Sequence, residues 1–175
     1  GAALAHDVVP VPQVPRPDEL PSRNERIADI PVDQRPADLP FFHNLDIRQP
    51  GWRADWPPSG PLDPTIHWWS RFVPTARFDD AWVDACRLLI PIDTMGWPAA
   101  SLAHAYQEPL ATVAVTVDLS VGFHRPADDE WLLAEATAPL ATGGLVAASG
   151  RVWDRAGALV ASGGQTMMCR PAPAP

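Results

Sequence analysis

A primary amide interrupts the last apolar segment of the chain. Gln165 directly follows Gly163-Gly164, and the period of two of a strand places it on the same face as Leu159, Ala161 and Met167. An amide on an apolar face costs free energy unless it is hydrogen-bonded. The paired glycines favour a bulge or a close approach of two backbones. Two interpretations stay open: a functional amide, or one at a sheet edge or bonded only to backbone, as most strand glutamines are.

Asp93 raises the same question more sharply, because a carboxylate costs more to bury than an amide. It lies four residues after Leu89 at the end of a predicted helix, so helical spacing places it on the buried face. Thr116 is a third polar group, near the start of an alternating strand. An aspartate at a helix end is usually solvated or capping, and a threonine suits a strand. Singly, neither residue indicates a function.

The helix that must position Asp93 begins after Asp79 or Asp80, either of which can cap its N-terminus. Its apolar stripe recurs every three or four residues, at Trp82, Ala85, Cys86 and Leu89. Asp84 and Arg87 fall away from this stripe. Pro91 should kink or weaken the last turn of the helix.

Strands are predicted on both sides of this helix. Their ranges are Phe42–Ile47, Thr65–Val73, Val113–His124, Trp131–Ala138, Gly144–Trp153 and Leu159–Arg170. The segment 52–64 is predicted as a loop and 96–106 as a turn, and Asp154-Arg155-Ala156-Gly157 as a hairpin turn with glycine available for positive φ. The third strand alternates cleanly, with Val113, Val115, Val117, Leu119, Val121 and Phe123 on one face and Thr116, Asp118, Ser120 and His124 on the other.

The order of these elements is strand, strand, helix and four more strands with short connections. Short connections between consecutive strands imply antiparallel pairing. A long helix wrapped by an antiparallel β-sheet is the hotdog fold, so the fold class predicted is α+β.

Proline divides the chain. Residues 1–40 are punctuated by proline, which removes backbone donors and favours an extended linker or a strap over a surface. A Pro-x-x-Pro spacing at Pro12 and Pro15 is an alternative interaction motif. We expect a proline-rich linker or strap at 1–40, a hotdog domain at 41–170 and a tail at 171–175.

Composition excludes some classes of function. The formal net charge is −8, and no basic run is present, which argues against nucleic-acid binding. Cys86 and Cys169 lie in apolar surroundings far from other metal-type ligands, and both are predicted to be small buried residues in a reducing compartment. No stretch is long and apolar enough to span a bilayer, and the N-terminus has no signal-like pattern, so we expect a cytoplasmic protein.

Four groups of residues, in order and at similar spacing, resemble the C-terminal hotdog of the bacterial acyl-CoA thioesterase II (TesB-like) family. They are Ile90-Pro91-Ile92-Asp93 before Gly96-Trp97-Pro98, the segment Thr116-Val117-Asp118-Leu119-Ser120-Val121-Gly122-Phe123-His124-Arg125-Pro126, Glu130-Trp131-Leu132-Leu133, and Gly157-Ala158-Leu159-Val160-Ala161-Ser162 leading to Gln165. The resemblance covers about Phe41 to Arg170. Phe-His-Arg-Pro and Leu-Val-Ala-Ser occurring together are the more specific part of it.

The resemblance implies hydrolysis of acyl-CoA by direct attack of water on the thioester carbonyl, in lipid metabolism. The water-holding residues of the family fall on Asp93, Thr116 and Gln165, with Asp93 as general base. The CoA thiolate is a good leaving group, so no strong general acid is needed. The resemblance implies no metal and no organic cofactor. His104 falls where the family often has a histidine and is given no role. Candidate ligands for the CoA phosphates are Arg125, Arg151, Arg155 and Arg170.

Family members usually carry two hotdogs in one chain, with the site near their interface. This chain matches only the second, and Gly1–Asp7 could be the end of a first. The resemblance therefore implies a partner, either the N-terminal hotdog or another copy of the chain, and hence an oligomer. Two alternatives stay open: a non-catalytic hotdog that binds acyl-CoA or completes a partner's fold, and a hydratase. The latter normally uses an Asp-His pair, which is not evident around His43, His67, His104 or His124.

Overall fold

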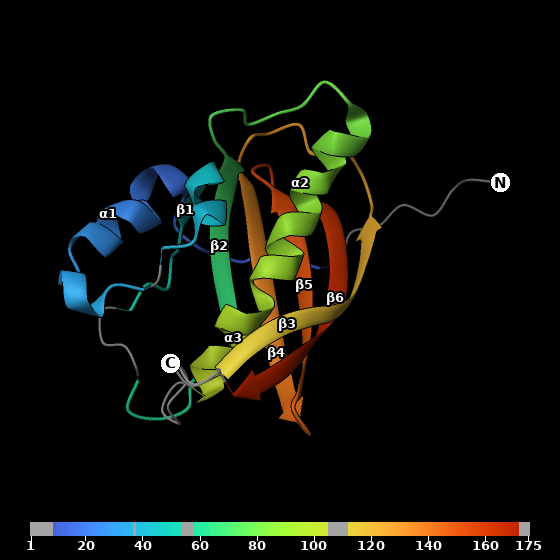
Figure 1. Cartoon of the computed structure of the whole chain (residues 1–175). Helices are drawn as coiled ribbons and strands as arrows, with labels where there is room; N and C mark the ends of the chain where they lie inside the picture. Colours follow the sequence, from blue (N-terminus) through green and yellow to red (C-terminus); the bar gives the residue numbers. More distant parts are fainter. Residues whose placement is uncertain (1–8, 37, 54–57, 105–111, 172–175) are drawn as a thin grey trace.

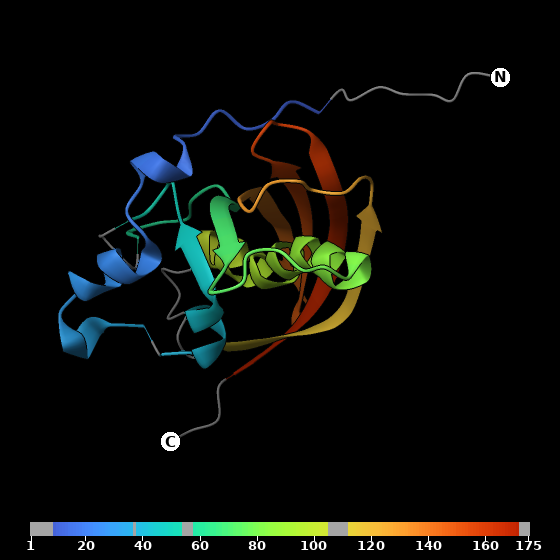
Figure 2. The same ribbon diagram turned by 90° about the horizontal axis from the view of Figure 1, so that it is seen from above.

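A computed structural model describes residues 9–36, 38–53, 58–104 and 112–171. A six-stranded antiparallel sheet in the order β1-β2-β4-β5-β6-β3 curves around a central helix, α2 (Figures 1 and 2). The strands are β1 Leu45–Arg48, β2 Thr65–Phe72, β3 Thr112–Phe123, β4 Leu132–Thr142, β5 Leu145–Asp154 and β6 Leu159–Pro171. The helices are α1 Arg23–Ala28, α2 Ala81–Thr94 and α3 Gly96–His104. The predicted α+β hotdog is confirmed, although Pro40–Asn44 forms a 3-10 helix where the first strand was expected to start.

Helix α2 starts where the sequence indicates but buries a different face. Asp80 caps it by accepting hydrogen bonds from the backbone N–H groups of Trp82 and Val83, at 2.9 and 3.0 Å. The predicted apolar stripe was wrong, because Trp82 is 78% exposed and Cys86 is exposed as well. Arg87, which lies away from the predicted stripe, is buried. Apolar residues at the start of α2 therefore face outward, and the helix packs on the sheet through its opposite face.

The end of α2 is continuous through Pro91, contrary to the expected weakening. The side chain of Pro91 is buried, and its carbonyl accepts from the backbone N–H of Met95 at 3.1 Å. The segment 96–106 was predicted as a turn, but α3 begins at Gly96 and runs to His104. This apolar segment forms a helix that packs against β4 and β5, and not a loop. The sheet thus receives two successive helices, and Asp93 lies just before the break between them.

Strand β3 contains a bulge that the period-two pattern does not show. Thr116 pairs with Met167 and Asp118 with Thr166, so Val117 is the extra residue. One extra residue reverses the alternation. Thr116, opposite buried Met167, and Leu119 beyond the bulge both face α2, whereas Val117 is exposed. The prediction that Thr116 lies on the face opposite to Leu119 was therefore wrong.

Two further predictions need correction. A register shift between β5 and β6 places Leu159 against the outer face of the sheet, whereas Ala161 and Met167 remain in the inner core with Gln165. Cys169 is only partly buried, although burial does raise the pKa of its thiol. The hairpin turn before β6 is confirmed, with Gly157 at φ 90°. Of the expected tail, only Pro171 lies in the described part of the chain.

Residues 9–20 of the predicted proline-rich segment, called the strap from here on, lie along the convex side of the sheet (Figure 2). The strap covers a second apolar cluster of Trp69, Trp131, Leu133 and Trp153 through Val9, Val11, Val14 and Leu20. The indole N–H of Trp69 donates to the Pro15 carbonyl at 2.9 Å. Arg48 donates to the carbonyls of Pro17 and Leu20, at 3.0 and 2.9 Å. Prolines suit this role because the strap is held by its carbonyls and side chains rather than by a ladder of N–H donors.

Candidate active site

Asp93, Thr116 and Gln165 come together on the concave side of the sheet. The hydroxyl oxygen of Thr116 lies 2.9 Å from Oδ1 of Asp93 and 3.0 Å from Oε1 of Gln165. Asp93 comes from the end of α2, Thr116 from β3 and Gln165 from β6. Thr116 and Gln165 are 49 positions apart in the sequence. The sequence flagged all of them, and the structure brings all of them together.

Gln165 joins the site to the end of α2. Its side chain is 4% exposed, and Nε2 donates to the carbonyls of Ile92 and Asp93 at 2.9 and 2.8 Å. Carbonyls in the last turn of a helix have no partner within the helix, so this amide supplies two missing donors. Both N–H groups of Gln165 are thereby engaged, and Oε1 is left facing Thr116. The amide is bonded to backbone, as one interpretation of the sequence expected, and is also part of the polar group.

The hydroxyl of Thr116 has a single proton but faces two acceptors. With Asp93 ionised, the hydroxyl can donate to the carboxylate or to the Gln165 amide oxygen, but not fully to both. With Asp93 protonated, the carboxyl can donate to Thr116, which then donates to Gln165. The direction of this short chain of hydrogen bonds therefore depends on whether Asp93 carries a proton.

The bulge in β3 is what aims Thr116 at Asp93. Residues paired across two strands project to the same face, and Thr116 is paired with inward-facing Met167. On β6, Gly163 lies so close to β3 that a Cβ there would be 2.2 Å from the Ser120 carbonyl oxygen. The close backbone approach expected at the paired glycines is confirmed. It keeps β3 tightly joined to the strand that carries Gln165.

The arginines proposed for the CoA phosphates have other contacts. Arg151 pairs with Glu135 at 3.2 Å, Arg155 pairs with Asp18 of the strap, and Arg170 contacts the sulfur of Met168 at 3.3 Å. Arg125 also has an interaction of its own. The structure does not bring these four arginines into one group with the polar trio. The side chain of His104 lies outside the described residues.

Histidine–carboxylate pairs are present, although the sequence did not make one evident. His43 lies 2.6 Å from Asp38, with side chains 59% and 78% exposed, and His67 lies 3.1 Å from Glu135. Neither pair shares a strand or helix with Asp93, Thr116 or Gln165. Both are pairwise contacts at or near the surface, of a kind that contributes little to stability.

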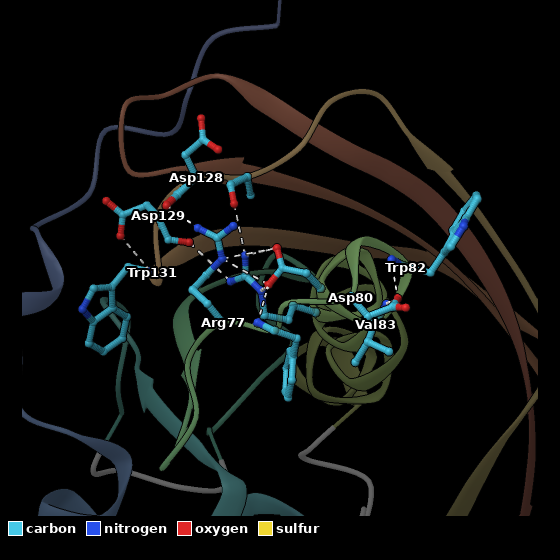
Figure 3. Close-up of polar contacts among 11 residues, drawn as sticks. Arg77, Asp80, Trp82, Val83, Asp128, Asp129 and Trp131 are labelled. Atoms are coloured by element: carbon cyan, nitrogen blue, oxygen red, sulfur yellow. Dashed lines mark hydrogen bonds and ion pairs between the residues drawn. The ribbon is translucent and has the colours of Figure 1, made fainter.

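A buried ion-pair network fixes the start of α2 to the loop before β4 (Figure 3). Arg87, with a side chain 1% exposed, donates to both Asp84 oxygens at 2.8 and 3.1 Å. It also donates to the carbonyls of Ala127 and Asp129, at 3.1 and 3.3 Å. Arg77 donates to Asp84 at 3.1 Å and reaches the carbonyl of Asp128. Burying Arg87 is tolerable because its donors meet a carboxylate and carbonyls.

This network lowers the pKa of Asp84. Burial alone would raise it, but hydrogen bonds from Arg87, Arg77 and the Phe78 backbone N–H outweigh burial and lower the pKa to about 2. Asp84 is therefore ionised at any neutral or mildly acidic pH. The sequence showed both charges of the Asp84–Arg87 pair but not the loop carbonyls that make burial possible.

A cavity of about 350 Å³ lies at the other edge of the sheet, between α1 and β1. Its lining is mostly polar and charged and includes Arg23, His43, Asp46 and Arg48. Because β1 and β3 are opposite edge strands, this cavity is separate from the trio. Within the described ranges, no cluster of His, Cys, Asp and Glu could hold a metal ion. None of the helices in those ranges is long and apolar enough to cross a bilayer.

The comparisons with known proteins agree with this architecture. The family model of the acyl-CoA thioesterase C-terminal domain matches residues 13–169. The chain therefore belongs to this family of hotdog domains, and the TesB-like resemblance is confirmed. A search of curated proteins finds no match.

Solved structures show the same fold at low identity. The acyl-CoA thioesterase II TesB2 of Mycobacterium marinum is 23% identical, with a TM-score of 0.72, over 98% of this chain and 59% of that one. A hotdog protein of unknown function from Alicyclobacillus acidocaldarius is 22% identical, with a TM-score of 0.67, over 99% and 59%. The tesB protein of Mycobacterium avium subs paratuberculosis is 23% identical, with a TM-score of 0.66, over 95% and 56%. The chain thus spans less than two thirds of these relatives.

Proposed function

We propose that this chain is the catalytic C-terminal hotdog of an acyl-CoA thioesterase that hydrolyses fatty or other acyl-CoA to the free acid and CoA. The proposal rests on one observation: the Asp93 carboxylate and the Gln165 amide oxygen both lie within hydrogen-bond distance of the Thr116 hydroxyl. A polar trio dispersed in space would have favoured a binding-only hotdog. Family membership supports acyl-CoA as the substrate class.

In the proposed reaction, Asp93 removes a proton from a water molecule as the water oxygen attacks the thioester carbonyl. The tetrahedral intermediate then collapses, the carbon–sulfur bond breaks, and CoA leaves as a thiolate that is protonated afterwards. Gln165 cannot donate to the water, because both of its N–H groups are engaged with backbone carbonyls. Its Oε1 can accept a hydrogen bond from the water and so orient it.

Thr116 links these two groups. While Asp93 is ionised, a Thr116 hydroxyl that donates to the carboxylate leaves Oε1 of Gln165 free to accept from water. Once Asp93 has taken the proton, its carboxyl can donate a hydrogen bond to the Thr116 hydroxyl. That hydroxyl then rotates to donate to Oε1 of Gln165. The hydroxyl thereby accommodates both protonation states without a large movement.

We further propose that a second hotdog covers the edge strand β3. Val115, Val117 and Phe123 on β3 and Trp82 on α2 are exposed apolar residues, and an unpaired edge strand is a natural pairing surface. The relatives contain more chain than this one. The partner would be an N-terminal hotdog or another copy of this chain, giving an oligomer with the trio near its interface.

The experiment is thiol release from a panel of acyl-CoAs, comparing the chain with Asp93→Asn. Asp118→Asn is the matched control, because Asp118 is an exposed carboxylate on the same edge strand as Thr116. We expect Asp93→Asn to lose at least about 10²-fold in turnover, the scale of general-base catalysis, with an unchanged circular dichroism spectrum. Asp118→Asn should keep its activity.

Full activity in Asp93→Asn would exclude the proposed base. If the chain itself is inactive, the assay is repeated with an upstream hotdog joined to residue 1. Turnover restored by that half would support the two-hotdog site. Acyl-CoA binding without turnover in the joined protein would favour the alternative, a hotdog that only binds acyl-CoA or completes the fold of a partner.

A further inference from the structure

Gly96, the first residue of α3, has no room for a side chain. A Cβ at this position would lie 2.1 Å from Nε2 and 2.8 Å from Cδ of Gln165, and 3.0 Å from the terminal methyl of Met167. The methyl of Met167 is the end of a flexible chain and can move aside. The amide of Gln165 cannot move as easily, because it is buried and bonded on both N–H groups.

The backbone at Gly96 does not itself require glycine. The described glycines with positive φ are Gly143, Gly144 and Gly157, so alanine fits the conformation at 96. Inside a helix, alanine is favoured over glycine by intrinsic propensity. The reason for glycine at this position is therefore the space that the Gln165 amide occupies.

We propose that Gly96 is a positioning residue of the active site, an inference that rests on the proposed function. The missing side chain lets Gln165 reach the Ile92 and Asp93 carbonyls across the break between α2 and α3. That anchoring holds Oε1 of Gln165 at 3.0 Å from Thr116 and ties the backbone of Asp93 to β6. A methyl group at 96 expels the amide and separates the trio without touching the substrate.

The primary test is the side-chain amide of Gln165 in ¹⁵N-labelled protein, followed by hydrogen exchange. Two buried hydrogen bonds should make its NH₂ signals exchange slowly in the parent chain. The signals are assigned by their disappearance in Gln165→Ala. In Gly96→Ala they should move and lose their protection. Gly122→Ala is the matched control, because a Cβ there meets nothing closer than 3.5 Å, and the signals should be unchanged.

A thermal-unfolding cycle separates this effect from general damage. Gly96→Ala should lower Tm in the parent chain but not in the Gln165→Ala background, where no amide blocks the methyl group. A protected Gln165 signal in folded Gly96→Ala, or an equal drop in Tm in both backgrounds, would overturn the inference.

Turnover distinguishes failure of the inference from failure of the proposed function. In an active form of the protein, Gly96→Ala should lower kcat at least tenfold with little change in KM, because it misplaces the water-holding groups rather than the acyl chain. If the Gln165 signal is lost and kcat stays the same, Gly96 still positions Gln165, but Gln165 does not serve catalysis.

Discussion

Asparagine at position 84 keeps the shape of the side chain and removes the charge that faces Arg87. Because the network lowers the pKa of Asp84 from an ordinary 3.8 to about 2, the ionised carboxylate stabilises the folded chain. At about 1.4 kcal/mol per pH unit, this difference contributes about 2 kcal/mol. Asp84 is well shielded, with a side chain 13% exposed, so solvent screening weakens the contribution little.

The sign follows from the lowered pKa. The contribution is fully present above about pH 4, where Asp84 is ionised in both the folded and unfolded chain, and is lost as the pH falls toward 2. Asp84→Asn lacks the titrating group and also leaves Arg87 without its counter-charge, which costs about 3–5 kcal/mol at neutral pH. The stability gap between parent and variant should therefore shrink by about 2 kcal/mol between pH 6 and pH 2.

Urea unfolding followed by tryptophan fluorescence at pH 6, 4, 3 and 2 measures this gap directly. Asp79→Asn is the control, because Asp79 is an exposed carboxylate immediately before the same helix, and its gap to the parent chain should stay near zero. A gap between Asp84→Asn and the parent chain that is constant over this range would refute the reasoning. In that case Asp84 would titrate identically in the folded and unfolded chain.

Two further outcomes follow from single hydrogen bonds. Thr116→Val should lower turnover in an active form about 10²-fold, the scale of losing one positioned group. Thr116→Ser keeps the hydroxyl and should keep most of the rate. Equal rates of the two variants in a thiol-release assay would show that the Thr116 hydroxyl does not link Asp93 and Gln165 in catalysis. Trp69→Phe keeps an apolar ring under the strap but loses the N–H bond to a strap carbonyl, and should cost about 1 kcal/mol in urea unfolding. Trp82→Phe, on an exposed side chain, should cost nothing, and equal effects would contradict the role of that bond.

The element order was predictable from local signals. The cap of α2 and the glycine at 157 depend on residues within a few positions of each other. The sequence therefore predicted the turn and narrowed the cap to Asp79 or Asp80. The buried face of α2 was not predictable in this way. Arg87 is buried because carbonyls 40 or more positions away accept hydrogen bonds from it, in addition to Asp84, and a pattern of apolar residues carries no record of such partners.

The candidate site shows the same limit. An amide on an apolar strand face pointed to Gln165. Helical spacing pointed to Asp93, although the stripe that it continued is not the buried face of α2. Thr116 came from the family resemblance, because the alternating pattern placed it on the opposite face from Leu119. The bulge at Val117 reverses that pattern, and a bulge depends on pairing with β6 that a single strand does not encode. Gly96 stood out only as part of a family landmark, and its contact with Gln165 could not be predicted, since that contact exists only where Gln165 meets the helix break.

The strap also limits how far the chain can be shortened from its N-terminal side in a protein made for experiments. Its valines and Pro15 complete an apolar surface that the sheet leaves open on its convex side. A shorter expression fragment starting at residue 41 would retain every strand and helix that carries the trio, yet it would display Trp69, Leu133 and Trp153 to solvent. Such a fragment has an exposed apolar patch of the kind that promotes aggregation. Trimming the chain to its hotdog domain would therefore yield a poorly soluble protein, whereas a fragment that keeps residues 9–20 retains its own cover.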